Sequence, residues 1–154
     1  MSGYPRTHIV VILIACFGLA GCGSGTHSEG GPPEGKAVYA GVCLPCHGID
    51  GKGQPDSYPP LAGSERANDH EAVPIRIVLH GLRGPLSANG EQYSGEMPML
   101  GNQLSDAEIA AVLSYVRASF GNKAAPVTEP VVAKIRAANP RPGPWSAEEL
   151  RAIK

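Results

Sequence analysis

The run Cys43-Leu44-Pro45-Cys46-His47 carries the clearest chemistry in this chain of 154 residues. Two cysteines three positions apart, followed directly by a histidine, form the Cys-x-x-Cys-His spacing that attaches a c-type haem. Each thiol can form a thioether with one porphyrin edge, and the imidazole can bind the iron from one side. The motif therefore predicts one covalently bound haem, with His47 as one axial ligand of the iron.

Two other uses of a Cys-x-x-Cys pair fit this chain less well. A thioredoxin-like dithiol belongs to a strand-to-helix context, and no strand pattern precedes Cys43. A structural zinc site takes four Cys or His ligands, but the other two of the four cysteines, Cys16 and Cys22, lie in an N-terminal export segment. We therefore expect haem attachment.

The first 21 residues are typical of a targeting segment rather than of a folded element. Arg6 lies in a short start without acids, and residues 9–20 form an apolar run too short to span a bilayer as a helix. The run ends in Leu19-Ala20-Gly21-Cys22, which resembles the lipobox of bacterial lipoproteins. That resemblance implies a signal peptide over residues 1–21 and lipidation of Cys22. The alternative is an ordinary signal peptide that leaves Cys22 as a free thiol.

The export signal and the haem motif favour the same compartment. Thioether attachment of haem is, by family resemblance, an extracytoplasmic process, and several acyl chains on Cys22 would anchor the protein stably to a bacterial membrane. Residue 23 is Gly rather than Asp, so the inner-membrane retention signal of the lipoprotein family is absent. We expect the periplasmic face, with the outer membrane favoured. Residues 23–33 are rich in Gly, Ser and Pro and predict a flexible tether with a reach of about 18 Å.

The part of the chain after residue 33 is long enough for one domain and too short for two. It has few aromatics and much Gly and Pro, so a bound macrocycle would supply much of its buried apolar surface. Removal of the signal peptide removes one cation, Arg6, and no acid, so the formal charge moves from −1 to −2. That balance argues against nucleic acid as a partner.

Helical patterns dominate this part, and strand signals are negligible. Ser105 and Glu108 form a capping box that opens the clearest helix, whose apolar positions are Ile109, Val112, Leu113 and Val116. Residues 34–43 and 74–80 predict two further helices. The pattern predicts an all-α fold.

Residues 35–122 resemble the small His/Met cytochromes c. That family crosses its first and last helices at a glycine and an aromatic, which lie eight and four residues before the first haem cysteine. Gly35 and Tyr39 occupy these positions. The resemblance implies a small cytochrome c fold over residues 34–122, in which Tyr39 packs against Tyr115 of the last helix.

The resemblance also implies how the haem histidine is held. Pro59-Pro60-Leu61 matches the family's Pro-x-Leu element. There, a backbone carbonyl, here that of Pro59, accepts the Nδ1 proton of His47, and Leu61 packs on the haem. Such a bond fixes the tautomer of the imidazole and raises its basicity.

The second axial ligand is expected in the run Tyr93-Ser94-Gly95-Glu96-Met97-Pro98-Met99. The family places a methionine, usually followed by proline, in a loop before the last helix. Met97 fits both requirements, and Met99 is its rival. His80, at the end of an apolar helix, would give a bis-histidine alternative. A thioether ligand raises the reduction potential of the iron.

Residues 123–154 form a C-terminal extension beyond the minimal family. Val131, Val132 and Ile135 predict a short amphipathic helix, and Ser146 with Glu149 predicts a second capping box. Similar tails with a Trp near the end occur on cytochromes that accompany oxidases and quinoprotein dehydrogenases. The extension is expected either to wrap the domain or to dock a partner.

The resemblance as a whole implies a class I monohaem cytochrome c in bacterial lipoprotein form. Such a protein is a one-electron carrier rather than an enzyme, and it has no small-molecule substrate. Its partners would be a dehydrogenase or quinol-oxidising complex and an acceptor such as a terminal oxidase. Two alternatives stay open: a dedicated haem c subunit of one oxidoreductase complex, and a haem enzyme or gas sensor with an open sixth site. The sequence Met97-Pro98 argues against open iron.

Overall fold

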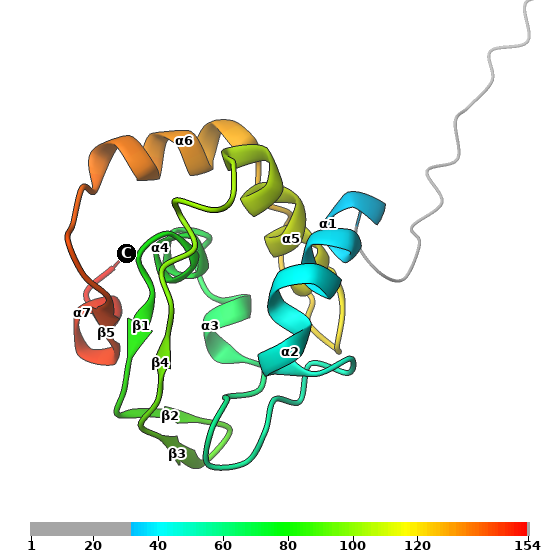
Figure 1. The fold of residues 1–154 in the computed structure, drawn as a ribbon, viewed down its shortest axis with the longest axis vertical. Coiled ribbons are helices and arrows are strands. Elements are labelled where there is room, and N and C mark those ends of the chain that lie inside the picture. Colours follow the sequence, from blue (N-terminus) through cyan, green and yellow to red (C-terminus); the bar gives the residue numbers. More distant parts are fainter. Residues whose placement is uncertain (1–31, 154) are drawn as a thin grey trace, which may run out of the picture.

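The computed structural model describes residues 32–153, and Figure 1 shows their arrangement. The predicted signal peptide, the lipidation site Cys22 and tether residues 23–31 lie outside the described residues. Helix α1 (Pro33–Val38) continues through a π-helical stretch (Tyr39–Cys43) into α2 (Leu44–His47). The helix predicted over residues 34–43 is therefore confirmed, and helical backbone carries on through the whole haem motif.

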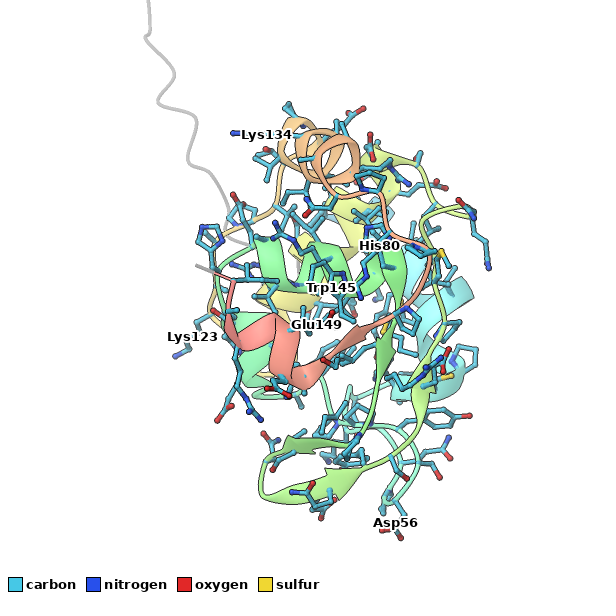
Figure 2. The ribbon with its side chains drawn as sticks, turned by 90° about the vertical axis from the view of Figure 1, so that its left-hand side faces the viewer. Asp56, His80, Lys123, Lys134, Trp145 and Glu149 are labelled. Atoms are coloured by element: carbon cyan, nitrogen blue, oxygen red, sulfur yellow. The ribbon has the colours of Figure 1, made fainter. Side chains whose placement is uncertain are left out.

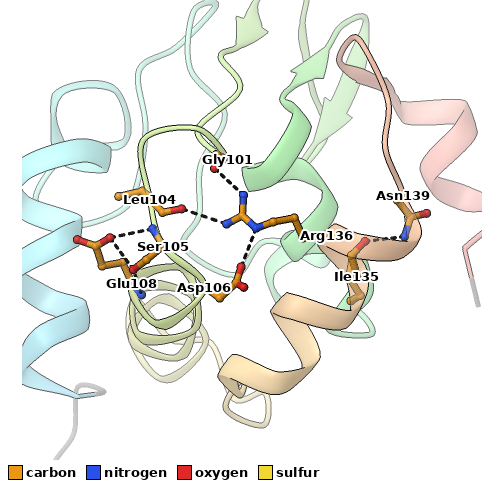
Figure 3. Close-up of polar contacts among 8 residues, drawn as sticks. All are labelled: Gly101, Leu104, Ser105, Asp106, Glu108, Ile135, Arg136 and Asn139. Atoms are coloured by element: carbon orange, nitrogen blue, oxygen red, sulfur yellow. Dashed lines mark hydrogen bonds and ion pairs between the residues drawn. The ribbon is translucent and has the colours of Figure 1, made fainter.

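Helix α5 (Asp106–Ala118) crosses α1, as Figure 1 shows. Its capping box is confirmed, because the Ser105 hydroxyl accepts the Glu108 amide at 3.3 Å and the Glu108 carboxylate accepts the Ser105 amide at 2.8 Å. Figure 3 shows this pair at the start of the helix. The two hydrogen bonds satisfy donors that a helix otherwise leaves unpaired, so they fix where α5 begins.

Helix α4 (Ala72–His80) lies at the centre, and short α3 (Glu65–Asn68) precedes it. Ile75 and Leu79 of α4 are fully buried, and they share one apolar cluster with Ile109 of α5 and Val132 of the C-terminal extension. The helix predicted from residue 74 begins two residues earlier, at Ala72. Burial on several sides makes α4 the element around which the haem-binding part and the extension both pack.

Short strands complete the fold, so the expectation of negligible strand is wrong and the all-α class is too narrow. Strands β1 (Leu82–Arg83), β4 (Glu96–Met97) and β5 (Trp145–Ser146) form a sheet in the order β4-β1-β5. Strand β1 runs antiparallel to β4 and parallel to β5. Strands of two residues are too short to show the alternation that identifies a strand in sequence.

The other two strands, β2 (Leu86–Ala88) and β3 (Glu91–Tyr93), form a hairpin. Its turn is Asn89-Gly90, and both residues have positive φ, 50° and 87°. Asn-Gly between short strands is a strong hairpin signal because its backbone twist matches that of paired strands. The sequence therefore contains a hairpin signal at Asn89-Gly90, which the search for helical patterns missed.

The C-terminal extension packs on the rest of the molecule through α6 (Glu129–Ala138) and α7 (Ala147–Arg151). Val132 and Ile135 of α6 and Leu150 of α7 are buried, which confirms the amphipathic helix. The second capping box, Ser146 with Glu149, is also confirmed. Among residues 32–153, no helix is both long and apolar enough to cross a membrane.

Candidate functional site

One apolar cavity brings most of the predicted site residues together. It encloses about 1300 Å³ of space, part of which opens to solvent. The side chains that line it include six chosen from the sequence: Cys43, Cys46, His47, Pro59, Leu61 and Met97. Both cysteines of the motif, His47 and Met97 therefore surround one apolar space.

The continuous helical backbone of the π-helical stretch and α2 explains why the motif residues face the cavity together. Residues three and four positions apart share one face of a helix, so Cys46 and His47 lie on the same side as Cys43. Burial, and then the neighbouring Cys46, raises the pKa of the Cys43 thiol to about 11. Within residues 32–153 neither cysteine forms a disulfide. Both sulfurs are thus available for thioether bonds.

The imidazole of His47 is buried and held in one orientation. Its Nδ1 lies 3.0 Å from the carbonyl oxygen of Pro59. A carbonyl can only accept, so Nδ1 carries the proton and Nε2 is the nitrogen free to bind a metal. Burial lowers the pKa of His47, against a smaller raising effect of the Pro59 bond, so the neutral form is favoured. A neutral imidazole is the form that ligates iron.

Tyr39 does not line the cavity but supports its wall. The ring is 2% exposed, and its hydroxyl donates to the carbonyl of Gly48 at 2.6 Å, next to His47. Its centroid lies 5.4 Å from that of Tyr115, in a tilted pair, and 5.3 Å from that of Phe120. Burial raises the pKa of Tyr39 to about 12, so the phenol stays protonated and donates at neutral pH.

The structure separates the rival iron ligands. Met97 lines the cavity from β4 and is partly buried. Met99 is 38% exposed and does not line it. His80 is buried on the other side of α4, beside Arg136 and Arg141, and also lies outside the cavity wall.

The remaining wall is apolar and comes from elements far apart in the sequence. Ile77 and Val78 of α4, Leu82 of β1 and Leu86 of β2 all face the cavity. Arg66 adds a cation, and its Nη1 donates to the carbonyl of Ser87 at 3.0 Å. Sequence reasoning missed these residues. Their periodicity marked only a buried helix face, and no local pattern singled out Arg66.

This arrangement fits haem c. Two thiols and a metal-binding nitrogen come from one turn of helix, the thioether of Met97 comes from a separate element of the cavity wall, and apolar side chains line the space around them. Arg66 would pair with a haem propionate, because a guanidinium matches the geometry of a carboxylate.

Comparisons with known proteins agree with the site. The cytochrome c family model matches residues 33–119, which is more than half of the chain. A cytochrome c-552 of Thermus thermophilus is 34% identical over 128 residues, covering 77% of this chain and 95% of that protein.

Two further relatives are named as parts of larger enzymes, and this chain spans a third or less of each. The fructose dehydrogenase cytochrome subunit of Gluconobacter japonicus is 33% identical over 113 residues, covering 68% of this chain and 22% of that subunit. The Cbb3-type cytochrome c oxidase subunit FixP of Azorhizobium caulinodans is 36% identical over 102 residues, covering 66% of this chain and 33% of that subunit. This chain therefore belongs to the cytochrome c family, and its cofactor is a covalently bound haem c.

Proposed function

We propose that this protein is a membrane-tethered one-electron carrier with His47 and Met97 as axial ligands of its haem iron. It would work on the periplasmic side of a bacterial membrane. It would pass electrons between a dehydrogenase or quinol-oxidising complex and an acceptor such as a terminal oxidase. The single observation that carries the proposal is that His47 and Met97 line one apolar cavity with both haem cysteines.

The bound haem supplies the reversible one-electron change between ferrous and ferric iron. The chain's own residues set the conditions for that change. Pro59 orients the imidazole of His47, the apolar wall limits water, and the thioether of Met97 favours the ferrous state and so raises the potential. With His47 and Met97 both holding the iron, no position would remain for a substrate there. This is why we propose a carrier rather than an enzyme.

The relatives support redox proteins as partners. One is named as a dehydrogenase cytochrome subunit and another as an oxidase subunit. A dedicated subunit of one such complex is the second candidate, with the C-terminal extension as its interface. Tight association that survives high salt would favour the subunit, whereas a mobile carrier should dissociate as ionic strength rises.

The proposed location depends on residues outside the described part of the chain. The apolar run before Cys22 and the lipobox-like Leu19-Ala20-Gly21-Cys22 support export and lipid attachment. Several acyl chains would hold the protein stably at the membrane surface. The Gly/Ser/Pro-rich residues between Cys22 and α1, which begins at Pro33, would let the haem domain turn toward its partners.

A redox titration followed by the visible spectrum, with carbon monoxide added to the reduced protein, tests the proposal. We expect one reversible one-electron wave, a six-coordinate spectrum in both states, and no binding of carbon monoxide without denaturation. Rapid binding to the native reduced protein would overturn the carrier and indicate an enzyme or gas sensor with an open sixth site.

A further inference from the structure

We propose that the C-terminal extension positions Met97, by holding both ends of the segment that carries it. This segment, residues 96–104, is called here the Met97 segment. The inference rests on the proposed ligation of iron by Met97 and names the device that keeps that ligand in place. Two separate contacts carry it, one from β5 and one from α6.

The first contact is the sheet. Leu82 of β1 pairs with Met97 on one side and with Trp145 of the extension on the other. The amide of Trp145 also donates to the carbonyl of Gly81 at 3.0 Å. Gly81 itself lies against the backbone of Met97, since a Cβ added to Gly81 would come within 2.5 Å of the Met97 carbonyl oxygen. The extension thus pairs with the edge of β1 opposite β4, and β1 in turn pairs with the strand that carries Met97.

A two-residue pair of strands has little stability of its own. Without β5, strand β1 would be an edge with β4 as its one partner in this sheet. The third strand therefore contributes to the order of β4 although it does not touch β4 in the sheet. The start of the Met97 segment depends on a strand from the end of the chain.

The indole of Trp145 fixes β5 in that position. It packs with a buried apolar cluster that also contacts Met97 and includes Val73, Ile77 and Leu82. The Arg141 guanidinium lies 3.9 Å from the ring centroid, and the Arg76 guanidinium lies 5.9 Å away. Figure 2 shows Trp145 beside α4, between His80 and Glu149.

The second contact holds the other end of the segment. Nη1 of Arg136 in α6 donates to the carbonyl of Gly101 at 2.5 Å, and Nη2 donates to that of Leu104 at 3.0 Å. Its Nε donates to Asp106 Oδ1 at 2.7 Å, at the start of α5 (Figure 3). The Arg136 side chain is one-third exposed. Charge-assisted bonds in such a position are stronger than neutral ones.

The same end of the segment is also hydrogen-bonded to the backbone of α4. The amide of Leu100 donates to Val78 at 3.0 Å, and that of Gly101 donates to Leu79 at 3.2 Å. Arg136 closes the remaining side, so the segment is held between α4 and α6. The span between the two contacts is short, which leaves Met97 few alternative positions.

The chemical consequence follows from the population of the ligating conformation. An equilibrium affinity is reduced by the fraction of molecules in which the binding group is in place. The extension makes no bond to the iron, but it raises that fraction for the Met97 thioether. Loosening either contact should release the ligand more often while leaving His47 and the thioether bonds unchanged.

The test uses full-length holoprotein with Arg136→Ala or Trp145→Leu, followed through the sulfur-to-iron charge-transfer band of the ferric state. Arg136→Lys keeps the charge beside Asp106 but is too short to reach Gly101 and Leu104. It replaces the alanine variant in the test if that variant folds poorly. Lys134→Ala, at an exposed position of the same helix, is the matched control. Each test variant should increase the fraction of protein without the band by about tenfold. The reduced test variants should also bind carbon monoxide without denaturation, which the wild type does not.

Unfolding followed by far-UV circular dichroism separates positioning from general stability. The proposal requires that the band is lost at lower denaturant concentration than the helices, and that the gap widens in the test variants but not in Lys134→Ala. If band and helices are lost together in every variant, the extension acts only on stability and the proposal is overturned. If the wild-type ferric protein has no such band, the proposed ligation of iron by Met97 is itself wrong. If the wild type has it and all three test variants keep it unchanged, ligation stands and the positioning role is wrong.

Discussion

Gly35 lies directly against the backbone of Ala111, so that α1 and α5 cross with no side chain between them. A Cβ added to Gly35 would overlap the carbonyl oxygen of Ala111 and lie 2.8 Å from the Cβ of Tyr115. The rings of Tyr39 and Tyr115 pack beside the crossing. The glycine and aromatic chosen from their distance to Cys43 therefore meet α5 as the family resemblance implied.

We predict that Gly35→Ala lowers the free energy of unfolding by about 1–3 kcal/mol, because the added methyl forces two backbones apart. Gly41→Ala is the matched control, since nothing lies within 4 Å of a Cβ added there. It should be neutral or slightly stabilising, as alanine favours helix over glycine. Guanidinium denaturation of the holoprotein measures both. Equal stability of the two variants would show that the crossing is not tight.

Met97→Ala should abolish the sulfur-to-iron charge-transfer band of the ferric protein and lower its reduction potential, because a neutral thioether favours ferrous iron. Met99→Ala should leave both unchanged, since Met99 is exposed and lies outside the cavity wall. The absorbance spectrum and a redox titration of both variants measure these effects. Persistence of the band in Met97→Ala, with loss in Met99→Ala, would reverse the assignment.

His80 predicts a loss of stability in mild acid. Its ring is buried, and Nε2 has no hydrogen-bond partner among the described residues. Burial lowers the pKa of His80, and the nearby Arg141, Arg136 and Arg76 lower it further. The unfolded chain therefore takes up a proton near pH 6.5 that the folded protein resists. Stabilisation from His80 is complete above that pH and decreases as pH falls toward the folded pKa.

The variant His80→Gln should flatten this dependence. Its free energy of unfolding should differ less between pH 7.5 and pH 5.5 than that of the wild type, when both are measured by denaturant titration. A variant with the full wild-type dependence would show that another group is responsible.

The capping box of α5 predicts a second effect of pH, at lower values. Hydrogen bonds from the backbone and hydroxyl of Ser105 lower the pKa of Glu108. Its contribution is therefore present above about pH 4.3 and is lost as pH falls through the lowered folded pKa. Ser105→Ala should cost about 1 kcal/mol at pH 7, and Ser105→Asn, which keeps an N-cap acceptor, should cost much less. Equal losses in the two variants would contradict a capping role.

Cys22→Ser should prevent lipidation and move the protein from the membrane fraction to the soluble fraction, with the haem spectrum unchanged. Cys16→Ser, within the apolar run, is the control and should still be lipidated. Metabolic labelling with a radioactive fatty acid, followed by fractionation, measures both properties. Labelling of the Cys22→Ser variant would exclude this site.

Prediction from sequence succeeded where function depends on local spacing. One helical turn places Cys46 and His47 on the same face as Cys43, and a capping box needs only Ser105 and Glu108. The short strands were missed for the opposite reason. The pairing of Leu82 with Met97 and Trp145 joins three distant segments, and none of them shows a pattern by itself.

The sequence by itself determined the cofactor, the face of the helix that holds it and the start of the helix that crosses it, because each depends on neighbours a few residues apart. Only the tertiary structure decided which methionine lines the cavity, that Arg66 reaches its wall, and that the C-terminal extension supports the Met97 segment. The physical reason is that burial and strand pairing are set when the whole chain closes on its core. Those contacts carry no local signature in the residues that make them.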